Sequence, residues 1–255
     1  MQRRTRRRWP WLLVVLTLAG VWWFLWQPNA PAPLEPVVPA SVPDTVTTTV
    51  TSTTLPPPTE ELPALPESDP TIEGRARGLA TGPLWEACLG SGGLVRRVVV
   101  ATANVADGES PREQLPFLAP QKKFAARQDG GRSVIDPAGY ARYDAVADLV
   151  ASIDATAAVA LYKAVWPLFE SAYAELGRRD RSWNDTLRLA INRLLLVPVT
   201  DRPLQLRQQP ETWALTDPGL ESISVAGKHL LRMGPRNARL VQAKLREIQA
   251  ALDAP

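Results

Sequence analysis

The chain has 255 residues, of which 29 are Lys or Arg and 26 are Asp or Glu, with a single Cys and a single His. One Cys (Cys88) excludes an intramolecular disulfide, and one Cys with one His (His229) provides too few ligands for a structural zinc or iron–sulfur site. The glycine-rich segment 90–93 lacks the Lys-Ser/Thr pair and the preceding strand of a phosphate-binding loop. We therefore expect no metal and no cofactor.

The charge is unevenly distributed along the chain. Residues 1–8 contain five Arg, residues 9–66 contain four acids and no base, and residues 67–255 contain 24 bases and 22 acids. Nucleic-acid-binding proteins concentrate basic charge in the folded domain, whereas here the longest segment is almost neutral. The distribution argues against nucleic acid as a partner.

Residues 9–26 contain no charged side chain and predict a transmembrane helix. At about 1.5 Å per residue they would span roughly 27 Å, close to the ~30 Å of a bilayer core. Trp residues stand at both ends, and the five Arg on the amino side predict a cytoplasmic N-terminus. The alternative is a cleaved signal peptide, whose apolar region is usually shorter, at about 7–15 residues. We expect an uncleaved single-pass anchor in the inner (cytoplasmic) membrane, with 1–8 as a basic cytoplasmic tail.

Residues 27–66 contain eleven Pro and a Thr-rich run at 45–54, but no aromatic residue. Such a segment cannot bury enough apolar surface to offset the loss of chain entropy on folding. It predicts a disordered linker that holds a folded domain, residues 67–255, away from the membrane in the periplasm or another extracytoplasmic space.

Residues 67–255 have mostly helical periodicity, and we expect a mainly α, compact domain with one small β-hairpin. Helices are expected near 71–80 and 92–103, the second with Leu94, Val95, Val98 and Val99 on one face. The hairpin is expected at 124–135, with Asp129-Gly130-Gly131 as its turn. A polar stretch at 108–120 predicts a loop.

The longest periodic region, 138–176, predicts two helices. Asp154 is the expected N-cap of the second, Pro167 should kink it, and Gly177 should end it. Further helices are expected from Ser182 to before Pro198, from 218 to 234, and from Pro235 onward, with an irregular loop at 199–216.

Several motifs resemble the bacterial domain-of-unknown-function 3014 family. They are the segments 62–69, 140–143, 166–177, 183–185, 220–224 and 230–235. The resemblance covers roughly 62–250 and implies an N-terminally anchored bacterial envelope protein. It implies no particular activity, cofactor or catalytic residue.

The polar residues that could form a site or a structural network stand in or beside these motifs: Arg142, Glu175, Asn184, Asp185, Glu221 and Arg232. The two Arg could bind an anionic ligand, but we expect them to form buried ion pairs with Glu175 or Glu221. Asp185 and Glu221 fit the first turns of helices, and Glu170 fits a solvated position.

The remaining candidates favour structural roles. His229 has no catalytic signature around it and fits a surface or cap position, and Cys88 fits a small core residue. We expect Trp166, Trp183 and Trp213 to fill the core.

Two functions remain open. The anchor and spacer favour a non-catalytic interaction or scaffolding module that binds an envelope protein or the cell wall. The alternative is a cell-wall glycan hydrolase or lyase that uses the helical carboxylates.

Overall fold

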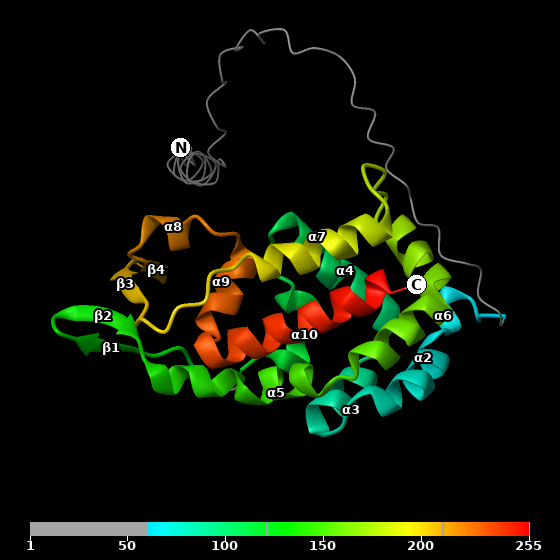
Figure 1. Ribbon diagram of the computed structural model, residues 1–255, viewed down its shortest axis with the longest axis horizontal. Coiled ribbons are helices and arrows are strands. Elements are labelled where there is room, and N and C mark those ends of the chain that lie inside the picture. The colour runs from blue at the N-terminus through cyan, green and yellow to red at the C-terminus, as the bar shows by residue number, and fades with distance from the viewer. Residues whose placement is uncertain (1–60, 121, 211, 255) are drawn as a thin grey trace, which may run out of the picture. The chain divides into compact units, whose positions relative to one another are not determined.

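The computed structural model describes residues 61–120, 122–210 and 212–254. The predicted cytoplasmic tail, the transmembrane helix and most of the linker lie outside the described residues. The described part is mainly helical and carries one small antiparallel sheet (Figure 1). The helices are α2 (Asp69–Ala76), α3 (Pro83–Leu89), α4 (Leu94–Asp107), α5 (Asp144–Ser152), α6 (Ala155–Ala174), α7 (Trp183–Leu195), α8 (Pro218–Glu221), α9 (Val225–Arg232) and α10 (Pro235–Asp253). The strands are β1 (Ala126–Asp129), β2 (Arg132–Ile135), β3 (Gln205–Gln208) and β4 (Trp213–Leu215).

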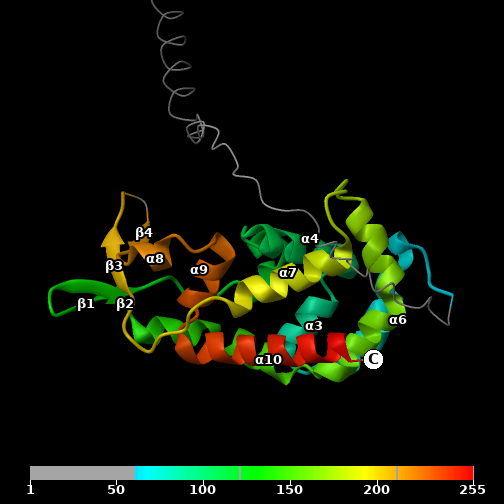
Figure 2. The same cartoon turned by 45° about the horizontal axis from the view of Figure 1, so that its top comes forward.

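Helix α10 packs against α5, α6 and α7. Figures 1 and 2 both show the sheet at one end of this helical layer and α6 at the other. Short 3₁₀ helices connect the elements: η1 (Leu65–Glu67), η2 (Arg77–Leu79), η3 (Arg112–Gln114), η4 (Pro116–Leu118) and η5 (Pro137–Tyr143).

Two hydrophobic cores form at the two ends. One lies between α2, α4, α6 and α7 around Val99, Val165 and Trp183. The other joins the sheet to α9 and α10 around Ile135, Leu215 and Leu230. A small cluster of side chains from α4, α7 and α9 lies between them.

Three predicted helix starts, after Asp154, Ser182 and residue 217, and the predicted kink are confirmed, whereas the helices expected from 71, 92 and 138 begin at Asp69, Leu94 and Asp144. The side chains of Asp154, Ser182 and Asp217 each accept a hydrogen bond from a backbone N–H in the first turn of the helix that follows. Pro167 lies inside α6, and the backbone of Val165 leaves helical geometry there. The hairpin is also confirmed, with both turn glycines at positive φ, although its first strand begins two residues later than expected.

The expected loop at 199–216 is wrong, because it contains two strands. β3 pairs with β2, with Ser133 opposite Leu206, and β4 pairs with β3, so the sheet order is β1-β2-β3-β4. Leu204 and Leu206 are buried while Gln205 and Arg207 are exposed. This alternation is that of a half-buried strand.

Two helical details and the linker boundary also differ from the predictions. The single helix expected at 218–234 is two, because Ser224 caps a new helix by accepting a hydrogen bond from the N–H of Gly227. Val98 does not join the buried face of α4 and is 45% exposed. Leu62 and Leu65 pack against the first core, so residues 61–66 belong to the folded domain rather than to the linker.

Helix α4 receives its N-terminal cap from a distant residue. Both carboxylate oxygens of Asp69, on α2, accept hydrogen bonds from the N–H groups of Gly93 and Leu94, at 2.5 and 2.9 Å. These bonds satisfy two of the backbone donors that a helix start leaves without intrahelical partners.

Candidate anion-binding pocket

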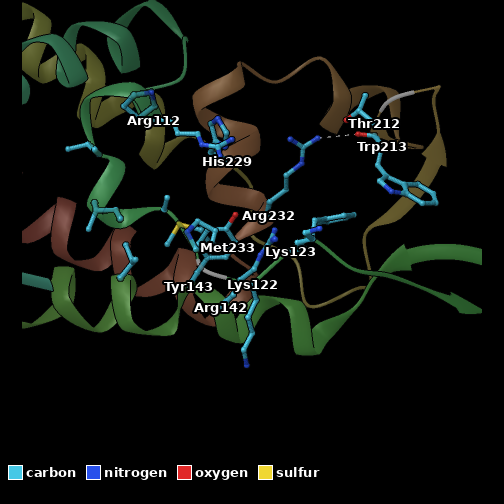
Figure 3. Close-up of a pocket in the computed structure, with 17 residues that line it drawn as sticks. Arg112, Lys122, Lys123, Arg142, Tyr143, Thr212, Trp213, His229, Arg232 and Met233 are labelled. Carbon is cyan, nitrogen blue, oxygen red and sulfur yellow. Dashed lines mark hydrogen bonds between the residues drawn. The ribbon is translucent and has the colours of Figure 1, made fainter. Parts of the chain in front are cut away.

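A pocket of about 660 Å³ lies beside the sheet, within the size range of small-molecule sites (Figure 3). Its walls come from the η3 and η4 region, the segment that leads into β1, η5, the start of α5, α9, and the start of β4. These segments are far apart in the chain, so only the tertiary fold forms the pocket.

Five basic side chains line this pocket: Arg112, Lys122, Lys123, Arg142 and Arg232. No Asp or Glu is among the lining residues in the part of the chain that the structure describes. Residues 67–255 as a whole carry almost equal numbers of acids and bases. The excess of positive charge is therefore concentrated here, where it favours an anion.

Arg142 is held by aromatic rings. Its guanidinium carbon lies 4.7 Å from the ring centroid of Tyr143 and 5.4 Å from that of Phe124. Its Nε atom is buried and has no hydrogen-bond partner among the described residues. A buried N–H donor without an acceptor is costly.

Arg232 lies at the carboxyl end of α9 and donates a hydrogen bond to the carbonyl oxygen of Trp213, at 3.3 Å (Figure 3). Neither Arg232 nor Arg142 forms the ion pair expected with Glu175 or Glu221. Glu175 pairs with Arg96, and the Glu221 carboxylate pairs with Lys228.

Glu221 connects β4 to the helices that follow it. One carboxylate oxygen accepts the N–H of Leu215 at 2.7 Å, and the other accepts from the Nζ of Lys228 at 3.0 Å. Burial raises the pKa of this carboxyl, but these two partners and the nearby Arg232 together lower it by more, so the net shift is downward. Glu221 is thus a charged structural group beside the pocket wall.

His229 lines the pocket, which its sequence surroundings did not indicate. Its Nε2 lies 2.9 Å from the hydroxyl of Ser110, in the loop after α4. Burial lowers the pKa of His229, and Arg232 and Arg112 lower it further. The same two cations disfavour the imidazolium that a serine nucleophile would require, so the Ser–His contact does not favour acyl transfer.

The other predicted polar residues lie elsewhere. Glu175 forms an exposed pair with Arg96, with both hydrogen bonds at 2.7 and 2.8 Å. Asp185 accepts from the hydroxyl of its capping partner Ser182, and Asn184 is half-buried in the same first turn. Glu170 is half-buried rather than fully solvated, and burial raises its pKa. The six candidates therefore do not form one network.

Of the three Trp expected in the core, Trp183 is fully buried, and it stacks on Phe169. Trp166 is half-buried, and Trp213 is half-buried at the pocket. Cys88 is also half-buried, and burial raises the pKa of its thiol, which disfavours the reactive thiolate.

Neither a metal site nor a straight membrane span is found in the described residues. They contain no group of three or more His, Cys, Asp or Glu that could hold a metal ion. No single helix among them is long and apolar enough to cross a bilayer, although residues 137–152 and 155–174 meet those criteria together as a pair bent by 70°.

The fold and pocket describe a mainly helical domain with a cation-lined cavity. A family model described as "Protein of unknown function (DUF3014)" matches residues 94–249, more than half of the chain, and the chain belongs to this family. The match includes all four strands and all the residues that line the pocket. No curated protein and no solved structure shows significant similarity to the chain.

Proposed function

We propose that this protein is a non-catalytic binding module of the bacterial cell envelope that holds an anionic ligand in the basic pocket. The observation that carries the proposal is the concentration of five cations, with no acid among the described lining residues, around the buried and unpartnered Nε of Arg142. Within this set Arg142 and Arg232 are half-buried, whereas Arg112, Lys122 and Lys123 are exposed.

The proposed location rests on the sequence. The uncharged segment 9–26, the five preceding Arg and the Pro-rich spacer support a single-pass inner-membrane protein with its domain outside the cytoplasm. A reporter enzyme that is active only in the periplasm, fused after Pro255, should be active in cells. Activity of a cytoplasmic reporter alone at this position would contradict the proposed topology.

The arrangement of the carboxylates disfavours the glycan hydrolase alternative. None of Glu170, Glu175, Asp185 and Glu221 lines the pocket, and three of them already accept hydrogen bonds from protein groups. Most glycosidases use a pair of carboxyl groups that face one cleft. Release of soluble fragments from cell-wall glycan by the purified protein, abolished by Glu175→Gln or Glu221→Gln, would restore that alternative.

Anion binding can be tested by thermal unfolding of the full-length protein in detergent. At constant ionic strength, sulfate, phosphate or citrate should raise the melting temperature above that in chloride. An anion at ten times its Kd should stabilise the native state by about 1.4 kcal/mol, a shift of roughly 3–6 °C for a domain of this size.

The double variant Arg142→Gln/Arg232→Gln should lose this anion-dependent shift. Arg207→Gln is the matched control, because Arg207 is an exposed arginine of β3 outside the pocket lining. Equal shifts in the double variant and the control would show that the anions act elsewhere and would refute the proposal.

A further inference from the structure

The positive charge of the pocket favours one kind of anion over others. The inference developed from it rests on the proposed function, anion binding in this pocket. Of the five cations, Arg142 and Arg232 are half-buried and the other three are exposed, so a carboxylate with its single negative charge would not balance even the two half-buried arginines. A phosphate monoester carries about −1.5 to −2 at pH 7 and presents three acceptor oxygens. The pocket's charge thus favours a phosphate group over a single carboxylate.

The arginines provide donors of the appropriate geometry. A guanidinium presents a planar fork that binds phosphate oxygens in pairs. The two aromatic contacts restrict the guanidinium of Arg142, and its Nε–H lacks an acceptor among the described residues. Figure 3 shows Arg112, Arg142 and Arg232 distributed around the pocket, so an anion inside it is approached from several elements.

Apart from Thr212 and His229, the rest of the pocket lining is largely apolar or aromatic, and a bare inorganic ion would not use that surface. Leu115, Leu118, Val146 and Met233 contribute aliphatic surface, and three aromatic residues contribute rings: Phe124, Tyr143 and Trp213. A volume of about 660 Å³ fits a ligand of drug-like size. The ligand should therefore carry an apolar or aromatic group beside its charge.

From these three observations we infer that the pocket binds a dianionic phosphate group joined to an apolar or aromatic body. This chemistry has two sources, a lipid with a phosphomonoester headgroup and a soluble organic phosphate. In either ligand the phosphate would contact the cations, and the remainder of the molecule would contact the apolar wall of the pocket.

The test is calorimetric titration of the full-length protein in phosphatidylcholine nanodiscs at pH 8, where a phosphomonoester is fully dianionic. The probes are phenyl phosphate, phenyl sulfate and inorganic phosphate. Phenyl sulfate has the same ring and a tetrahedral anion but only one charge. Phenyl phosphate should bind at least about tenfold more tightly than phenyl sulfate, because of the additional charge, and more tightly than inorganic phosphate, because of the ring.

The variants place the binding in the pocket. Arg142→Gln and Arg232→Gln should each weaken phenyl phosphate binding at least about tenfold, whereas Arg207→Gln should leave it unchanged. Since Arg142 also contacts two rings, its variant is judged only if its melting curve is cooperative. Arg232→Gln keeps the proposal testable if Arg142→Gln fails to fold.

The outcomes separate this inference from the proposed function. Equal affinity for phenyl sulfate and phenyl phosphate would refute the phosphate inference and leave an anion-binding pocket. Absence of binding by any probe, or binding unaffected by both pocket variants, would refute both. If phenyl phosphate is preferred, tighter binding of dioctanoyl phosphatidic acid would assign a lipid ligand, and weaker binding would assign a soluble one.

Discussion

Glu221 offers the sharpest test of whether the polar residues beside the pocket stabilise the fold. Its carboxylate accepts the backbone N–H of Leu215, a residue that is only 2% exposed, and the side chain of Lys228. Glu221→Ala removes both acceptors and leaves the Leu215 N–H without a partner. Glu221→Gln keeps one neutral oxygen that can still accept from Leu215.

The magnitude follows from these contacts. A hydrogen bond between a charged group and a buried donor contributes about 1.5–3 kcal/mol. The Lys228 pair, with side chains 31% and 19% exposed, adds less than about 1 kcal/mol, because Lys228 still bonds the Glu221 carbonyl oxygen in the variant. We expect a loss of about 2–3 kcal/mol for Glu221→Ala. For a domain of this size that is a fall of roughly 4–12 °C in melting temperature, with Glu221→Gln intermediate.

The assay is thermal unfolding monitored by circular dichroism at pH 7, with Glu175→Ala as the control. Glu175 and Arg96 form an exposed pair with side chains 48% and 40% accessible, so removing it should change the melting temperature little. A melting temperature of Glu221→Ala equal to that of the wild type, or a loss as large for Glu175→Ala, would refute this assignment of roles.

The pH dependence adds a second criterion. The pKa of Glu221 is lower in the folded protein than its usual 4.5, so its ionised form stabilises the native state. This contribution is complete above the unfolded pKa and is lost as the pH falls through the folded one. The difference between wild type and Glu221→Gln should therefore shrink below about pH 4.5.

Two further outcomes are expected. The pKa of His229 is depressed below 6.5, so unfolding takes up a proton, and stability should fall as the pH decreases from about 7 towards the folded pKa. Thermal melts of His229→Gln should lack this loss of stability in that pH interval, which lies above the range where carboxylates titrate. An equal loss in the variant would contradict the assignment. Gly234→Ala should cost roughly 2–4 kcal/mol by denaturant unfolding, because φ is +84° and the new Cβ would lie 2.4 Å from the Tyr140 ring; an unchanged midpoint would contradict this.

Most of the helical framework could be predicted because its signals are local. A capping side chain lies within three residues of the N–H that it accepts, as for Asp154 and Ser182, and the Pro167 kink arises within one helix. The hairpin at 126–135 is similarly local, because two glycines form its turn. These interactions depend on residues that are neighbours in the chain, so the sequence pattern contains them.

The second half of the sheet, β3 and β4, lies where the sequence predicts a loop, although the segment carries a weak strand signal. The alternation of Leu204 and Leu206 with Gln205 and Arg207 is a strand pattern, but it is short and ends near a proline. What makes it a strand is pairing with β2, some seventy residues earlier, and burial against α9 and α10. Propensity over four residues is too weak to decide such a segment without its partner.

Ion-pair partners were also decided by the tertiary structure. The sequence predicts that Arg142 and Arg232 pair with Glu175 or Glu221. In the folded domain Glu175 forms an ion pair with Arg96, and Glu221 forms one with Lys228. A long charged side chain reaches many neighbours, so the sequence alone does not select one. The cap that Asp69 provides to α4 is another such contact, between residues 24 and 25 positions apart.

The sequence by itself determined the class of this protein: a mostly helical domain of the DUF3014 family, without an intramolecular disulfide, preceded by an apolar segment and a Pro-rich spacer. Only the tertiary structure brought Arg112, Arg142, Arg232 and His229 to one pocket, from η3, η5 and α9. The physical reason is the separation along the chain over which each kind of interaction acts. Backbone hydrogen bonding and amphipathic periodicity act over a few residues, whereas a pocket collects side chains whose only relation is that their elements pack together.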